Sequence, residues 1–140
     1  MSAFRTSILL LDKERPDTPL AATLTYTSRD PYAVELALLD AYGDELQAHV
    51  FARSLLADGL SGAAGQGDVR VGPVGNDDWL VIELSGEELR NEAADTVSFF
   101  VAREQVVSFV ARSYRLVPKG LEHEWIDWDR EIASVLGGAA

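Results

Sequence analysis

The side chains best suited to catalysis or metal binding are few in this sequence. There are only two histidines, and His123 lies between two glutamates, close to Asp127 and Asp129. This spacing fits neither a zinc-binding H-E-x-x-H helix nor an acidic calcium loop with its central glycine. The acidic residues are better explained by a last helix, with Asp127 as its N-cap and Asp129 near its positive end. We therefore expect no metal site.

The remaining polar motifs also lack the context that chemistry requires. His49 alternates with Val50 and Phe51, which predicts an outward, solvated histidine on a strand. The glycines of segment 61–67 are irregularly spaced and form no phosphate-binding motif. Ser61 lacks the flanking pattern of a nucleophile elbow and has no histidine suited to act as its base. We expect no catalytic residue, no cofactor and no enzymatic activity.

Positive charge is concentrated near the C-terminus. Arg112, Arg115 and Lys119 are three and four residues apart, which places them on one face of a helix. Two interpretations are open. The cations form a solvated face that complements the negative end of the helix dipole, or they form a docking stripe for an acidic segment of a partner protein.

Trp125 and Trp128, with Ile126, form an aromatic cluster just before the last helix. Here too the sequence leaves two interpretations. The tryptophans either pin that helix to the rest of the fold or act as exposed anchors for a partner, a role in which tryptophan is common. The candidate partner-binding residues are therefore Arg112, Arg115, Lys119, Trp125 and Trp128.

These residues must be positioned by an α+β domain that we expect to span residues 1–140. Alternation and turn signals predict four strands in a meander, a short helix, and three or four further strands. The expected strands are 5–11, 20–27, 32–40, 45–52, 68–74, 79–85 and 91–101, with the short helix over 53–58. Gly59 is expected at C′ of that helix, segment 61–67 as a flexible loop, and segments 75–78 and 86–88 as turns.

The last part of the chain changes to a helical period. Val106 or Val107, Val110, Tyr114 and Val117 fall on one face, and Pro118 follows as a stop signal. A final helix is expected from about residue 127 to 136. Strands followed by helices in this order are typical of an α+β fold.

Composition limits the classes of function. With 12 Lys and Arg against 23 Asp and Glu, the net charge is −11, which opposes binding to nucleic acid and to anionic lipid. No apolar run approaches the roughly 18 residues of a membrane span, and no signal peptide is recognised. The absence of cysteine excludes thiolate sites and disulfides. We expect a cytoplasmic protein that does not insert directly into a membrane.

Four stretches in register resemble the SsgA-like family of sporulation and cell-division proteins of actinobacteria, with spacing most similar to the SsgB-type branch. The stretches are Asp30-Pro-Tyr-Ala-Val34, Val50-Phe-Ala-Arg-Ser-Leu-Leu56 with Gly59, Gly65-Gln-Gly-Asp-Val-Arg-Val71 with Pro73, and Val117-Pro-Lys-Gly-Leu-Glu122 leading to Asp127-Trp-Asp129. Together they cover essentially the whole chain. Because such motifs can specify the fold alone, they do not by themselves locate the binding surface.

The resemblance implies a fold and a function. It implies two packed antiparallel sheets with helices, similar to the whirly-type single-stranded nucleic-acid-binding proteins. It further implies a non-catalytic adaptor at the division septum that recruits FtsZ, with SsgA-type proteins as further partners, and a homo-oligomer such as a trimer. The alternative that the fold raises is single-stranded nucleic-acid binding, which requires a basic groove that this acidic chain lacks.

Overall fold

Eight antiparallel strands form one continuous sheet in the computed structural model, which describes residues 2–85, 96–126 and 128–138. The sheet order is β4-β3-β2-β1-β8-β7-β6-β5. The strands are β1 (Ala3–Asp12), β2 (Leu20–Thr27), β3 (Ala33–Leu39), β4 (Glu45–Ala52), β5 (Ala64–Gln66), β6 (Val69–Val74), β7 (Asn76–Ser85) and β8 (Thr96–Ala102). The helices are α1 (Arg53–Asp58), α2 (Arg103–Leu116), the 3-10 helix η2 (Glu122–Trp125) and α3 (Trp128–Gly138).

The sheet consists of two meanders joined through a short pairing. Strands β1 to β4 pair in sequence, and so do β5 to β8. Among the described residues, the strand pairing between the two halves joins Leu11 and Asp12 of β1 to Phe100 and Phe99 of β8. Of the expected two packed antiparallel sheets, the antiparallel pairing and the strand number agree with the structure, but the β1–β8 pairing joins the two halves into one sheet. Likeness to the whirly-type fold stays a prediction.

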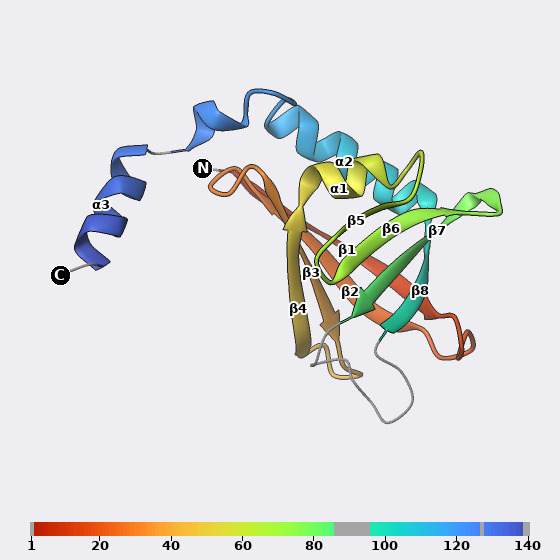
Figure 1. The fold of residues 1–140 in the computed structure, drawn as a ribbon. Helices are drawn as coiled ribbons and strands as arrows, with labels where there is room; N and C mark the ends of the chain where they lie inside the picture. Colours follow the sequence, from red (N-terminus) through yellow and green to blue (C-terminus); the bar gives the residue numbers. More distant parts are fainter. Residues whose placement is uncertain (1, 86–95, 127, 139–140) are drawn as a thin grey trace.

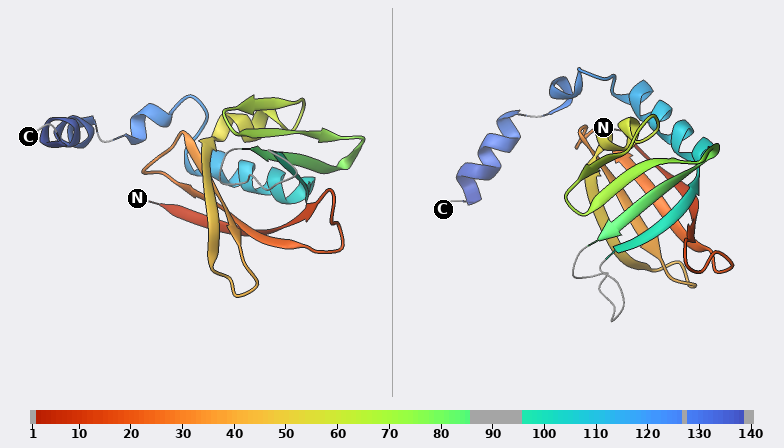
Figure 2. Two further views of the ribbon diagram at one scale, coloured as in Figure 1. Left: turned by 60° about the horizontal axis from the view of Figure 1, so that its bottom comes forward. Right: turned by 45° about the vertical axis from the view of Figure 1, so that its right-hand side comes forward.

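The sheet curls around one hydrophobic core. Figure 1 shows the strands wrapped into a nearly closed barrel with α1 and α2 across one end, and Figure 2 shows the same arrangement from two other sides. The inward residues of every strand from β1 to β4 and from β6 to β8 contribute to this core. Leu55 and Leu56 of α1 and Val106, Phe109 and Val110 of α2 close it from above. The predicted apolar face of α2 is confirmed for Val106 and Val110, with Val107 40% exposed, whereas Val117 is buried but lies beyond the end of the helix.

Several predicted boundaries need correction. The loop predicted over 61–67 contains the short strand β5, which pairs with β6. The turn predicted over 75–78 is tighter, because Gly75 adopts a φ of +33° and Asn76 already pairs with Val74. The described part of the predicted strand 91–101 begins at Thr96. Residues 91–95, the predicted turn 86–88 and the proposed N-cap Asp127 lie outside the described residues.

Gly59 has a different role from the one expected. Its φ of −63° is right-handed, so it does not terminate α1 in the left-handed conformation typical of a C′ glycine. A Cβ at this position would lie 2.5 Å from Cγ1 of Val71 and 2.7 Å from its Cβ. Glycine is therefore needed because α1 and β6 approach each other closely here.

Among the described residues, no helix is long and apolar enough to span a membrane.

The close approach at Gly59 gives a test of the packing between α1 and β6. We expect Gly59→Ala to lower the free energy of unfolding by about 1–3 kcal/mol, since the added methyl group must displace Val71. Urea unfolding followed by circular dichroism measures this. Gly62→Ala is the matched control, because a Cβ at Gly62 would meet nothing within 4 Å. Equal stability of the two variants would contradict this role for Gly59.

Candidate partner-binding surface

A buried arginine holds together the end of the barrel on which the candidate residues lie. Arg53, the first residue of α1, is only 2% exposed. Its Nη1 donates hydrogen bonds to the carbonyl oxygens of Ser113, at 3.0 Å, and Val117, at 2.7 Å. Its Nη2 lies 3.1 Å from Oε2 of Glu122, an ion pair without hydrogen-bond alignment. One side chain thus ties α1 to the last turn of α2 and to the segment that follows it.

Two tyrosine rings enclose the Arg53 guanidinium. Its Cζ lies 4.1 Å from the ring centroid of Tyr114 and 4.9 Å from that of Tyr26, within the range of cation–π attraction. The Tyr26 hydroxyl donates to the carbonyl oxygen of Pro31 at 2.9 Å. Burial raises the pKa of Tyr26 to about 12, although Arg53 opposes the shift. The Tyr26 hydroxyl is therefore hydrogen-bonded inside the protein, and the Arg53 cation is surrounded by two carbonyl oxygens, two aromatic rings and a carboxylate.

Glu122 supplies the counter-charge. Burial alone would raise the pKa of this carboxyl, but backbone hydrogen bonds and the contact with Arg53 outweigh it, and the pKa lies below its usual value. One of these bonds is donated by the Gly120 backbone N–H to Oε1 at 2.7 Å. Glu122 is consequently ionised at neutral pH and fixes the turn that leads out of α2.

The stretches that carry the family resemblance contact one another in the structure, three of them at Arg53. Arg53 comes from the second stretch and Glu122 from the fourth. The first stretch contributes the carbonyl oxygen of Tyr32, which accepts the Arg53 backbone N–H at 2.7 Å. The third stretch contributes Val71, which packs on Gly59. The role of Arg53 is missed from the sequence alone, although a charged residue at the first position of a short helix with an apolar pair is an available signal.

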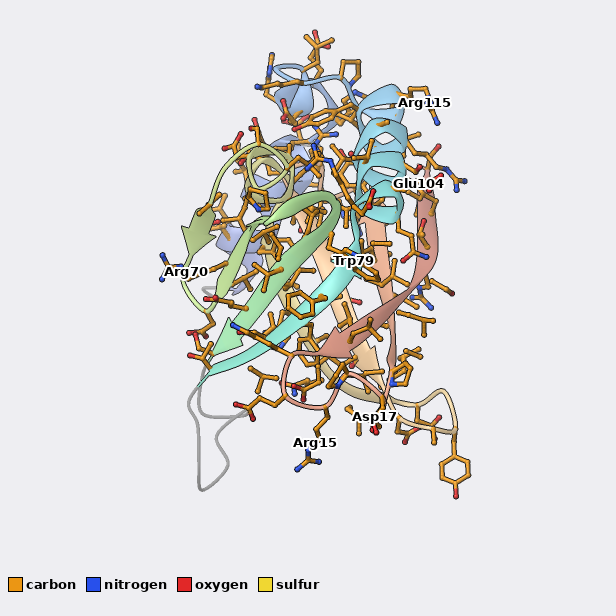
Figure 3. The ribbon with its side chains drawn as sticks, turned by 90° about the vertical axis from the view of Figure 1, so that its right-hand side faces the viewer. Arg15, Asp17, Arg70, Trp79, Glu104 and Arg115 are labelled. Carbon is orange, nitrogen blue, oxygen red and sulfur yellow. The ribbon has the colours of Figure 1, made fainter. Side chains whose placement is uncertain are left out.

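The predicted cationic residues lie on the surface beside this cluster. Arg112 and Arg115 are exposed on α2, and Figure 3 shows Arg115 projecting from the helix, away from the barrel. Lys119 is exposed but lies in the turn beyond α2, which ends at Leu116, so the prediction that it shares the helix face is wrong. The Arg112 guanidinium lies 4.3 Å from the ring centroid of Phe4 in β1. Two of the three cations therefore form a surface together with the start of β1.

The tryptophan cluster lies on the segment that leaves the barrel. Trp125 is in η2 and is 44% exposed, and Trp128 begins α3, although its side chain lies outside the described set. Figures 1 and 2 show α3 standing away from the barrel. Its Ile132 and Val135 are 56% and 72% exposed. Trp125 is therefore available to a partner, and Ile132 and Val135 form an exposed apolar stripe on α3 in the same region.

The histidines are placed differently from one another. His49 shares the inward face of β4 with Phe51 and is half-buried, with Nε2 3.2 Å from Oε1 of Gln47. The expected outward position is therefore wrong, and Val50 points outward instead, at 64% exposure. His123 is exposed in η2. Among the described residues, no group of three or more histidines and carboxylates is arranged to hold a metal ion.

Comparison with known proteins defines the class to which this chain belongs. A sequence profile of the family described as "Streptomyces sporulation and cell division protein, SsgA" matches residues 20–122. The sporulation-specific cell division protein SsgB of Frankia casuarinae is 37% identical over 120 residues, covering 86% of this chain and 80% of that protein. SsgB of Streptomyces coelicolor is 36% identical over 118 residues, covering 84% and 82%.

Solved structures agree with these sequence matches. The crystal structure of an SsgA-like sporulation-specific cell division protein from Thermobifida fusca has a TM-score of 0.78 and 31% identity, and covers 95% of both chains. A structure connected with SsgB mutations that correlate to longitudinal cell division during sporulation of Streptomyces coelicolor has a TM-score of 0.75 and 30% identity, and covers 89% of this chain and 95% of that one.

The chain belongs to the SsgA family of sporulation and cell division proteins. The SsgB-named relatives indicate a sporulation-specific cell division protein, and this is not a known enzyme family. The comparisons give no support to the nucleic-acid-binding alternative.

The Arg53–Glu122 pair gives a test with a defined pH dependence. Because the pKa of Glu122 is lower in the folded than in the unfolded chain, its carboxylate stabilises the fold above about pH 4.5, the ordinary value, and this contribution is lost as the pH falls through the folded-state pKa. We expect Glu122→Gln to lower the free energy of unfolding at pH 7 by about 1–3 kcal/mol, and the deficit to shrink in acid.

Urea unfolding at a series of pH values from 7 to 3 measures the effect. Glu124→Gln is the matched control, since Glu124 is an exposed neighbour in the same 3-10 helix. A deficit for Glu122→Gln that stayed constant across this range would show that the carboxylate charge contributes nothing to stability.

Proposed function

We propose that this protein is a non-catalytic adaptor of cell division that recruits FtsZ to future septa during sporulation. The observation that carries the proposal is the match of nearly the whole chain to proteins named as sporulation-specific cell division protein SsgB. The family resemblance supplies FtsZ as the recruited protein, SsgA-type proteins as further partners, and the septum as the place of action within the cytoplasm.

The surface chemistry supports an adaptor that works through protein contacts. The proposed contact residues are Arg112, Arg115, Lys119, Trp125 and Trp128. The described residues among them lie on α2 and on the segment that follows it, at the end of the barrel held by Arg53. Exposed arginine and tryptophan are the side chains that most often dominate binding energy at interfaces.

The first test is co-sedimentation of the purified chain with GTP-assembled FtsZ from the same organism at physiological salt. Recovery in the polymer pellet at a saturable ratio is the expected result. An unrelated acidic protein of similar size controls for trapping, and FtsZ with GDP controls for dependence on the polymer. If the chain stays in the supernatant under all these conditions, direct recruitment of FtsZ is wrong.

The outer face of the first meander supports the further proposal that the chain forms a homo-oligomer. Two rows of paired residues cross this face: Arg5, Thr25, Glu35 and Val50, and Ser7, Thr23, Ala37 and Ala48, with Leu9 and Ala21 beside them. Only two of these ten residues are charged, in a chain with 25% charged residues. Depletion of charge is typical of the centre of a protein interface, so we propose a second copy as the occupant.

Light scattering after size exclusion tests self-association. We expect a mass above that of the monomer, with a trimer as the state that the family resemblance implies. Val50→Glu together with Leu9→Glu should shift the mass to the monomer, because Val50 and Leu9 are 64% and 55% exposed on the outer face. Tyr42→Glu, at a 91% exposed turn position, is the control. A monomeric mass for the unmodified chain at high concentration would refute the proposal.

A further inference from the structure

Strand β1 has an open edge over most of its length. Residues Ala3–Leu10 pair with β2, whereas within the described residues the pairing of β1 with β8 is confined to Leu11 and Asp12. Figure 3 shows β1 running beside α2 and reaching β8 only at its far end. An unpaired strand edge offers backbone donors and acceptors to an added strand.

The hydrogen bonds of Ser2 show which backbone groups face this open side. Its N–H donates to Oγ of Ser28 at 2.9 Å, and its carbonyl oxygen accepts the Ser28 N–H at 2.8 Å, so Ser2 faces β2. Successive residues of a strand direct their N–H and C=O groups to opposite neighbours. Ala3 and Arg5 therefore direct these groups toward the open side. At the other end of the strand, the Lys13 N–H reaches the Ser98 carbonyl on that same side, at 2.9 Å.

A basic hollow lies at the start of this edge. It has a volume of about 360 Å³. It is lined on one side by Ser2, which precedes β1, and by Ala3 and Phe4 of β1, and on the other side by Arg112, Arg115 and Leu116 of α2. Within the described parts of the chain, neither arginine has an ion-pair partner. In a protein with a net charge of −11, two guanidinium groups that line one hollow beside a strand edge form a local concentration of positive charge.

The arginine nearest the strand is held in place. The Arg112 guanidinium stacks on Phe4, whose ring lies 5.1 Å from that of Phe109 and 6.1 Å from that of Tyr26. Because Phe109 and Tyr26 are buried, Phe4 is a fixed platform. A guanidinium that is held before binding loses less conformational entropy when it meets a carboxylate.

We propose that the hollow and the open edge of β1 form the docking site for an extended acidic segment of a partner protein. The segment adds as a strand beside Ala3 and Arg5, and its carboxylates pair with Arg112 and Arg115. This inference rests on the proposed function, since the segment belongs to a recruited division protein. Charge complementarity supports this occupant, because the acidic remainder of the surface repels such a segment and leaves this site as the favourable one.

The probe for a direct test is a fluorescein-labelled octapeptide of alternating Asp and Val, with the Lys and Val octapeptide as its charge-reversed counterpart. We expect the Asp peptide to bind in a fluorescence anisotropy titration, with affinity that falls as salt rises, and the Lys peptide not to bind at this site. Arg112→Glu with Arg115→Glu should weaken binding of the Asp peptide roughly tenfold or more.

Matched controls separate the site from net charge. Arg15→Glu with Arg70→Glu makes the same change of charge at exposed positions that Figure 3 shows far from Arg115. It should change the affinity less than about twofold, since exposed distant charges are largely screened. Equal losses in the two double variants, or no binding of the Asp peptide to the unmodified chain at millimolar concentration, would overturn the inference.

A second variant tests strand addition itself. Ala3→Pro removes a backbone N–H on the open side and leaves the β2 side intact, so binding should weaken several-fold while the urea midpoint stays unchanged. Ala3→Val keeps the N–H and is the control. Normal binding by Ala3→Pro would overturn strand addition. FtsZ pelleting without peptide binding would refute this site alone, whereas peptide binding without pelleting would support the site and refute direct FtsZ recruitment.

Discussion

The burial of one charged side chain, Arg53, is the constraint around which the end of the barrel is organised. A guanidinium removed from water is stable only when carbonyl oxygens, aromatic faces and a counter-charge replace the lost solvent. Here Ser113 and Val117 supply the carbonyls, two tyrosines supply the faces, and Glu122 supplies the charge. Because these groups come from β2, α2 and the following turn, satisfying Arg53 fixes all three relative to α1.

This arrangement separates the interior of the protein from its partner-binding exterior. The interior cluster is closed, with the cation paired and the Tyr26 hydroxyl bonded. On the outside of the same helix, Arg112 and Arg115 have no acidic partner in the described structure. Helix α2 is thus held from within by its last turn and offers its unpaired cations outward. A surface that is to bind another protein benefits from such a rigid support, because less order must be gained on binding.

The sequence predicted local structure better than long-range contact. Alternating apolar residues located the strands of the first meander, and the helical period located α2, since both patterns depend on neighbouring residues. The pairing of Leu11 and Asp12 with β8, which joins the two halves, has no such local signal. Gly59 was recognised as special but for the wrong reason, because the sequence cannot show that Val71 packs against it. Of the candidate site, Arg112 and Arg115 are exposed, and so is Trp125, for which the sequence left both an exposed and a packed position open. The stacking of Arg112 on Phe4 depends on the tertiary fold and has no local signal.

The Arg53–Glu122 pair also restricts how this protein can change over evolutionary time. The two residues are 69 positions apart in the chain, yet loss of Glu122 alone leaves the Arg53 charge buried without its partner, and loss of Arg53 alone leaves the half-buried Glu122 carboxylate without its counter-charge. Lysine is not an equivalent substitute for Arg53, because its ammonium group lacks the planar fork with which the guanidinium reaches two carbonyl oxygens and a carboxylate together. Descendants of this sequence are therefore expected to keep both residues or to lose both by way of a weakened intermediate, while the exposed arginines of α2 are free to drift as partners change.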